Sequence, residues 1–287
     1  MTGRTDAMRQ VSHMEETIQA AESLLRSCRF CEHRCGVDRT QSGAGKCGCT
    51  SDSRVYFEDL LWGEEESITP TYAVFFAGCD LRCEFCSAAE SNRRPTSHPP
   101  VDPHEVAARV RAQRPAPISF SFIGGEPTVH LHTALRIAGA LPPGLQLVWN
   151  SNFYFTSEAA ALLDGVIDVF IADLHFGNDE CARGLAGAEN YLEVVTRNLR
   201  WAHDRKPLVL RHLVVPGHVE CCTEPALRWV AAELPAADVR LMTNYLPGES
   251  RLIPEMNRPL AAAEIGRAET LARALGIGES GWDTNRK

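Results

Sequence analysis

The chain has 287 residues, of which 44% are hydrophobic and 23% are charged, and its formal net charge is −8. The acidic balance argues against a nucleic-acid partner, because binding to phosphates requires a basic face. The sequence has no apolar run of membrane-spanning length and no signal peptide, so we expect a cytoplasmic protein without a membrane partner. Eleven cysteines in such a protein indicate metal binding or catalysis, not disulfides.

The first 71 residues are expected to form a helix and a cysteine-rich module followed by a linker. Residues 1–11 are polar and are predicted to be disordered. The segment from Ser12 to Glu15 matches a capping box, which predicts a helix that continues to about Arg26. The acidic segment 53–71 is predicted to connect the module to the next domain.

Five cysteines at short spacings form the core of this module. Four thiolates within some twenty residues can hold either a tetrahedral zinc ion or a complete [4Fe–4S] cluster. The residue types leave both metals open, and the fifth cysteine is a spare ligand. The expected ligands are Cys28, Cys31, Cys35 and Cys47, with Cys49 as the spare.

A second set of cysteines, Cys79, Cys83 and Cys86, follows the apolar run 72–77 and Gly78. The apolar run predicts a buried strand, so the cysteines are expected on the loop after it. A cubane [4Fe–4S] cluster normally takes four protein ligands, so three thiolates would leave one iron open to another molecule. A zinc knuckle or a structural cluster is the alternative at this point.

From residue 72 onward, short apolar runs alternate with amphipathic stretches. Such repeats predict parallel strands with right-handed helical crossovers. Eight repeats would close a full barrel, so six repeats predict an α/β fold with a partial (β/α)6 TIM-like barrel. We expect this barrel to span residues 72–260 and a C-terminal helix and tail to span 261–287. The strands are predicted at 72–77, 118–123, 145–149, 166–172, 208–215 and 239–243.

Polar side chains gather where these predicted strands end, which is where the chemistry of such barrels is found. Arg211 lies within an apolar strand, where a charge requires an anionic partner, either on a ligand or on Asp173. The other candidate residues at the strand ends are Gly124, Gly125 and Glu126, then Asn150 and Asn152, then His175, and finally Tyr245.

The spacing C-x3-C-x-Φ-C, with Phe85 at the aromatic position, resembles the signature of the radical S-adenosylmethionine (SAM) superfamily. In that family the open iron binds the amino and carboxylate groups of SAM, and one electron from the cluster cleaves it to a 5′-deoxyadenosyl radical. The Gly-Gly-Glu sequence one βα unit later is similar to the motif that contacts the SAM amino group. The resemblance implies a [4Fe–4S] cluster, SAM, and a reductant such as flavodoxin or ferredoxin.

Nearly the whole chain also resembles the activating enzymes of pyruvate formate-lyase, and more closely a PflX-like group related to them. Besides the two cysteine sets, the shared features are the sequences GGEPT, D-x-x-F-G, RHLVVPG and M-x-x-Y-x-P. Two departures are that Asn150 replaces an aspartate and that His175 replaces a lysine expected to hold the SAM carboxylate. The SAM contacts that the resemblance implies are Phe85, Gly124, Gly125, Glu126, Asn150, Asn152, Asp173, His175, Arg211 and Tyr245.

We therefore expect an enzyme that cleaves SAM and abstracts hydrogen from a small-molecule or short-peptide substrate. The alternatives are an activase that acts on a glycine of a partner protein and, outside catalysis, an iron–sulfur electron carrier or a zinc-bound interaction protein. Cys221 and Cys222 could donate a hydrogen atom, supply an extra ligand or be ordinary cysteines. Cys181 is expected to be an ordinary buried cysteine, and His130 and His132 are expected at the surface.

Overall fold

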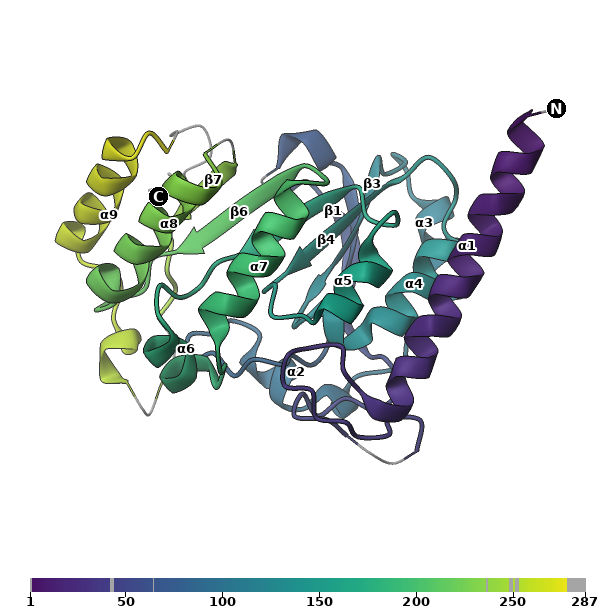
Figure 1. Cartoon of the computed structure of the whole chain (residues 1–287), viewed down its shortest axis with the longest axis horizontal. Helices are drawn as coiled ribbons and strands as arrows, with labels where there is room; N and C mark the ends of the chain where they lie inside the picture. The colour runs from purple at the N-terminus through teal and green to yellow at the C-terminus, as the bar shows by residue number, and fades with distance from the viewer. Residues whose placement is uncertain are drawn as a thin grey trace. The chain divides into compact units, whose positions relative to one another are not determined.

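The computed structural model describes residues 2–41, 44–63, 65–235, 237–247, 250 and 253–277 (Figure 1). The chain divides into two compact units. The first contains residues 1–80, 90–150 and 155–169, and the second contains 81–89, 151–154 and the chain from Phe170 onward. The predicted C-terminal tail after residue 277 lies outside the described residues.

The first unit is built on strands β1 to β4. β2 (Thr71–Phe76) pairs in parallel with β3 (Ser119–Gly124), and β3 pairs in parallel with β4 (Gln146–Ser151). β1 (Val55–Leu61) pairs antiparallel with β2, so the prediction of a mere linker at 53–71 was wrong. Its side chains are half-buried or exposed, as expected for an antiparallel edge strand, whereas β2 is almost wholly buried.

Helices pack on these strands. α1 (Thr2–Leu24) begins far before Ser12, so the prediction of disorder over residues 1–11 and of a cap at Ser12 was wrong. It packs along α4, beside which it runs in Figure 1, and contacts α5. Asp102 caps α3 (Pro103–Ala112) and accepts hydrogen bonds from the backbone of its first turn. The other helices here are α2 (Ala89–Arg93), α3 (Pro103–Ala112), α4 (Leu131–Ala140) and α5 (Ser157–Leu163).

The second unit contains the remaining parallel strands. β5 (Val169–Asp173) pairs with β6 (Leu208–Leu213), and β6 pairs with β7 (Asp238–Met242). A π-helical turn, Val219–Thr223, leads into α8. The helices are α6 (Asp179–Ala186), α7 (Tyr191–His203), α8 (Glu224–Glu233) and α9 (Ala262–Ala274).

The strand order follows the order of the chain, β1 to β7. The α/β prediction is therefore confirmed, and each of the six predicted strands is present with shifted ends. The sequence did not predict β1, α2 or α6. Among the described residues, no helix is both long and apolar enough to cross a membrane.

Candidate functional site

The three cysteines of the C-x3-C-x-Φ-C segment lie on the loop after β2, as predicted. Cys79 is buried, whereas Cys83 and Cys86 are half-buried, and all three are free thiols. The backbone N–H of Cys86 donates to the carbonyl of Cys83 at 3.2 Å, so a tight turn joins these two residues. Soft thiolate ligands on one short loop suit an iron–sulfur cluster.

Backbone hydrogen bonds hold the second half of this loop on α6. The N–H groups of Arg82 and Glu84 donate to the carbonyls of Ala186 and Leu185, each at 2.9 Å. These carbonyls lie in the last turn of α6, where a helix leaves its carbonyls without intrahelical partners. The loop that carries Cys83 is therefore held by hydrogen bonds to carbonyl groups that have no partner within the helix.

The Gly-Gly-Glu sequence packs directly against the chain that leads into the cysteine loop. Gly125 N–H donates to the carbonyl of Phe76 at 2.8 Å, and Glu126 N–H donates to that of Gly78 at 3.0 Å. A Cβ at Gly124 would lie 2.2 Å from the backbone nitrogen of Phe76. This close approach of one strand end to another requires a glycine at position 124.

Phe85 packs on the loop after β5. Its ring centroid lies 5.5 Å from that of His175 and 5.9 Å from that of Phe176. The backbone N–H of His175 donates to the hydroxyl of Tyr191 at 2.9 Å. Burial lowers the pKa of His175, and Asp173 opposes this shift only in part. At neutral pH His175 is therefore an uncharged hydrogen-bonding group.

Asp173 and Arg211 are register partners on the adjacent parallel strands β5 and β6. Both side chains are half-buried. This adjacency keeps open both roles that the sequence suggested for Arg211, as an anion-binding group and as the partner of Asp173.

Two of the predicted contact residues, Asn152 and Tyr245, already make structural hydrogen bonds. Asn150 and Asn152 are buried at the end of β4, and the side-chain oxygen of Asn152 accepts from the N–H of Tyr154 at 2.8 Å. The hydroxyl of Tyr245 donates to the carbonyl of Met256 at 2.7 Å. Tyr245 could therefore meet a ligand only as an acceptor, and its role stays a prediction.

A fully buried arginine lies among the N-terminal cysteines. Arg39 has no exposed surface, and its guanidinium donates to the carbonyls of Val129 at 2.8 Å and Thr50 at 2.7 Å. Its Nη1 also lies 3.7 Å from Cys28 Sγ. A buried positive charge requires a negative charge nearby, and neutral carbonyl groups do not supply one. Thiolates at the cysteines would supply it.

Without a metal, only Cys47 meets that requirement: burial raises the pKa of Cys28 and of Cys31, and the hydrogen bond with Cys47 raises the pKa of Cys49. Burial opposes the charge on Arg39, but attraction to thiolates at Cys47, Cys28 and Cys49 raises its pKa overall. The pKa of Cys47 is lowered to about 6, first by a hydrogen bond from Cys49 and further by Arg39. The spacing of the cysteines did not predict that Arg39 would lie among them.

His130 and His132 are buried, so their predicted surface location was wrong. His130 Nε2 lies 2.9 Å from the carbonyl of Ala77 and 3.8 Å from Cys49 Sγ. His132 Nε2 lies 2.8 Å from the carbonyl of Ser51, and burial lowers the pKa of His132 to about 3. Both histidines are neutral parts of the packing around the N-terminal cysteines.

A further group of sulfur ligands lies away from both predicted sets. Cys181 was expected to be an ordinary cysteine, yet its sulfur lies 3.7 Å from that of Cys221. Because α6 was not predicted, the proximity of Cys181 to Cys221 and Cys222 was not predicted either.

The family model of the radical SAM superfamily matches residues 73–230. The chain belongs to this superfamily. It is also 35% identical over 267 residues to the uncharacterized protein MJ0674 of Methanocaldococcus jannaschii, covering 91% of this chain and 78% of that protein. Radical SAM membership confirms the prediction of an enzyme and implies SAM and a [4Fe–4S] cluster. The narrower PflX-like grouping stays a prediction.

Solved structures show the same fold. SuiB of Streptococcus suis bound to its precursor peptide SuiA superimposes with a TM-score of 0.53 at 15% identity, over 71% of this chain and 46% of SuiB. SuiB bound to S-adenosylmethionine gives the same TM-score and identity, over 71% of this chain and 47% of SuiB. The chain thus spans about half the length of SuiB. The likeness confirms the predicted partial-barrel fold of this radical SAM protein.

Proposed function

We propose that this enzyme reductively cleaves SAM at a [4Fe–4S] cluster held by Cys79, Cys83 and Cys86, and abstracts a hydrogen atom from a small-molecule or short-peptide substrate. The observation that carries the proposal is the linkage between two motifs. Glu126 of Gly-Gly-Glu hydrogen-bonds to Gly78, the residue that directly precedes Cys79. The motif assigned to the SAM amino group is thereby held next to the first cluster ligand.

When bound, the cluster supplies the electron that cleaves SAM. The part of the chain is to hold SAM in one orientation: Gly124, Gly125 and Glu126 at the amino group, and Arg211 with neutral His175 at the carboxylate. Phe85 lies against His175, so the aromatic residue of the cysteine loop also fixes the loop after β5. Positioning and exclusion of side reactions are the usual contributions of a protein to cofactor chemistry.

The substrate class follows from the groups near the strand ends. Asn150, Asn152, His175 and Tyr245 are uncharged hydrogen-bonding residues, which suit recognition of a polar ligand. The structural neighbour SuiB, with the same fold, is bound to a precursor peptide, which supports keeping a short peptide within the proposed class. A reductant such as flavodoxin or ferredoxin is the expected protein partner.

The substrate class can be tested by following deuterium. Reconstituted enzyme is incubated with SAM, reductant and a fully deuterated extract of metabolites and short peptides. The proposal predicts that deuterium appears in 5′-deoxyadenosine, because the abstracted hydrogen atom ends there. A glycyl-radical activase would instead show the doublet of a glycyl radical in electron paramagnetic resonance once its partner protein is added, and that result would overturn the small-substrate proposal.

Arg211→Ala is expected to weaken SAM binding while leaving cluster assembly intact. Loss of a hydrogen bond to a charged group costs on the order of 1.5–3 kcal/mol, which corresponds to roughly ten- to a hundredfold in affinity. Anaerobic calorimetry of SAM binding measures the change, with iron content as the control. Unchanged affinity would assign Arg211 to a structural pair with Asp173.

The N-terminal cysteines are proposed to hold an auxiliary metal site. Replacing Cys28 and Cys47 together by serine is expected to remove that metal, and the loss relative to the unaltered chain identifies it. A loss of about four irons indicates a cluster, and a loss of about one zinc indicates a structural ion. Equal iron and zinc contents in the two proteins would refute the site.

The buried charge provides a second check on this auxiliary site. Arg39→Met keeps a long side chain but removes the cation next to Cys28 and Cys47. If thiolates bound to metal balance that charge, the variant should hold the metal less tightly, and a chelator should remove it faster. Equal rates of removal would mean that Arg39 is not balanced by a metal–thiolate site.

A further inference from the structure

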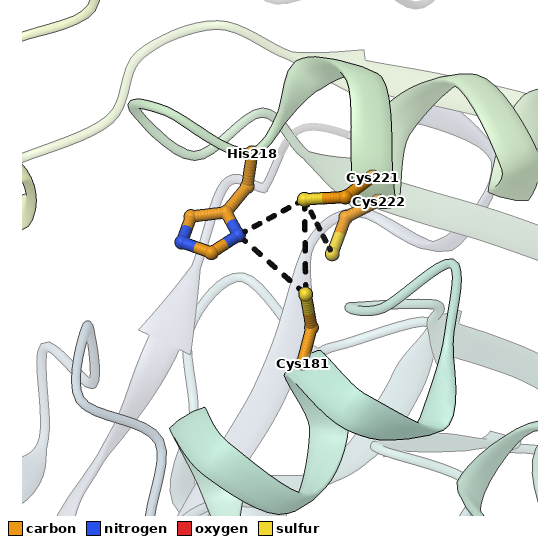
Figure 2. A group of neighbouring side chains, drawn as sticks. All are labelled: Cys181, His218, Cys221 and Cys222. Atoms are coloured by element: carbon orange, nitrogen blue, oxygen red, sulfur yellow. Dashed lines mark hydrogen bonds between the residues drawn. The ribbon is translucent and has the colours of Figure 1, made fainter.

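We propose that Cys181, His218, Cys221 and Cys222 form a structural zinc site, distinct from both sets of cysteines discussed above. All four residues belong to the second unit of the chain. Their ligand atoms, three sulfurs and one imidazole nitrogen, all lie within 4.8 Å of one another. Figure 2 shows the four side chains converging from α6 on one side and from the turn before α8 on the other. Three cysteines and one histidine are a common ligand set of structural zinc.

Four of the six distances between these atoms are close to those around a single tetrahedral ion. Zinc–sulfur bonds of about 2.3 Å and zinc–nitrogen bonds of about 2.0 Å place tetrahedral ligands about 3.8 Å apart for two sulfurs and about 3.5 Å apart for sulfur and nitrogen. The sulfur of Cys221 lies 3.7 Å from that of Cys181 and 4.0 Å from that of Cys222. His218 Nδ1 lies 3.2 Å from Cys221 Sγ and 3.7 Å from Cys181 Sγ.

These distances also separate zinc from the alternative of a cubane cluster. The protein ligands of a cubane bind different irons, so their sulfurs are spread around the cluster and do not surround one point. The group is compact enough to surround a single ion, because its ligand atoms all lie within 4.8 Å of one another. Zinc has no redox chemistry, so the ion would be inert beside the reductive chemistry proposed for this enzyme.

The local backbone explains why adjacent cysteines converge. Cys221 and Cys222 lie on the π-helical turn Val219–Thr223, and His218 immediately precedes it. The N–H groups of Cys222 and Thr223 both donate to the carbonyl of His218, at 2.9 and 3.2 Å, which widens this turn. π-helical insertions are rare and occur frequently at functional sites.

Asn178 supports the ligands from outside the site. Its side-chain oxygen accepts from the N–H of Cys181 at 2.7 Å, and its side-chain nitrogen donates to the carbonyl of Cys221 at 2.6 Å. The same nitrogen lies 3.2 Å from Cys181 Sγ and 3.9 Å from Cys222 Sγ. Such outer contacts orient metal ligands, and N–H groups stabilise the charge of bound thiolates.

Gly177, the last residue of the D-x-x-F-G sequence, makes this arrangement possible. A Cβ at this position would lie 2.3 Å from the carbonyl oxygen of Cys222, so the two backbones approach more closely than any side chain permits. This contact brings the start of α6, with Cys181, against the π-helical turn.

The site also suggests a structural role. α6 carries Cys181 in its first turn, and its last turn accepts the backbone hydrogen bonds of Arg82 and Glu84. A helix of eight residues is too short to be stable by itself. Fixing its first turn to an ion would therefore steady the acceptors that hold the loop of Cys83.

The test is a comparison of metal content in the full chain and its variants. Cys181→Ser is expected to lose about one zinc per chain, while the iron content of anaerobically reconstituted protein stays unchanged. Glu180→Gln, on the same exposed turn of α6, is the matched control and should keep the zinc of the unaltered chain. His218→Asn removes a ligand from the other element, and it should show the same loss if Cys181→Ser fails to fold.

Loading with cobalt(II) gives a second readout that does not depend on catalysis. The unaltered chain and the control should show the intense ligand-field bands of tetrahedral cobalt and the charge-transfer bands of its thiolates. In both ligand variants the intensity of these bands should fall by the amount that one cobalt site contributes. Equal zinc content in control and ligand variants would overturn the proposal. So would a disulfide between Cys181 and Cys221 in the freshly isolated chain, detected by mass spectrometry.

Discussion

Cys83→Ala is expected to abolish the reductive cleavage of SAM by this enzyme. A cluster that leaves one iron open for SAM has three protein ligands, so losing one leaves two thiolates and no substitute at the same loop. Chromatography measures the 5′-deoxyadenosine formed after anaerobic reconstitution and reduction. Its amount should fall to that in protein-free controls. Iron content of the variant should fall in parallel.

Ser87→Ala provides the matched control for that result. Ser87 is the exposed neighbour of Cys86 on the same loop, and its hydroxyl is not among the proposed ligands. This variant should cleave SAM at the rate of the unaltered enzyme. If Cys83→Ala cleaved SAM as fast as Ser87→Ala, the assignment of the cluster to these cysteines would be wrong.

Gly124→Ala is expected to lower the free energy of unfolding by about 2–6 kcal/mol, through backbone strain and overpacking. Gly124 adopts φ +115°, which disfavours any side chain, and its added Cβ would meet the backbone of Phe76 at 2.2 Å. This contact joins the end of β3 to the end of β2, which leads into the cysteine loop. The variant should therefore also hold less [4Fe–4S] cluster. Urea denaturation followed by circular dichroism measures the free energy of unfolding.

Gly144→Ala separates the two causes. Gly144 has φ +90°, but a Cβ there would meet no atom within 4 Å. This control carries only strain, about 1–3 kcal/mol, so Gly124→Ala should be the more destabilising of the two. Equal losses would mean that the close approach of the two strand ends contributes nothing to stability.

The fold could be predicted largely because buried parallel strands form continuous apolar runs. β2 is such a run, and the sequence located it within one residue. β1 escaped prediction because its side chains are only partly buried and its flanks are acidic, so an edge strand resembled a linker. α6 was missed although local signals mark it: Asn178 caps its start, and Gly187 ends it in the left-handed conformation. Only β1 depends on a tertiary contact, its pairing with β2, to be identified.

The candidate site divides in the same way. Cys79, Cys83 and Cys86 are separated by so few residues that spacing alone indicated their chemistry. The position of Arg39 could not be inferred, because its burial depends on a carbonyl contributed by Val129.

The cluster of Cys181 and Cys221 was equally hidden. Forty residues separate these two cysteines, and no local motif spans that distance. Only the folded turns after β5 and β6 bring the two sulfurs together. The sequence did single out Cys222 and its neighbour as a possible extra ligand pair, but it could not supply their partners.

Product analysis of SAM turnover decides whether this chain is a SAM-cleaving enzyme. The unaltered chain, reconstituted anaerobically with iron and sulfide, is incubated with SAM and dithionite, and the products are quantified. We expect 5′-deoxyadenosine and methionine in equal amounts, both dependent on reductant. Intact SAM in protein that carries a full [4Fe–4S] cluster and binds SAM would contradict it.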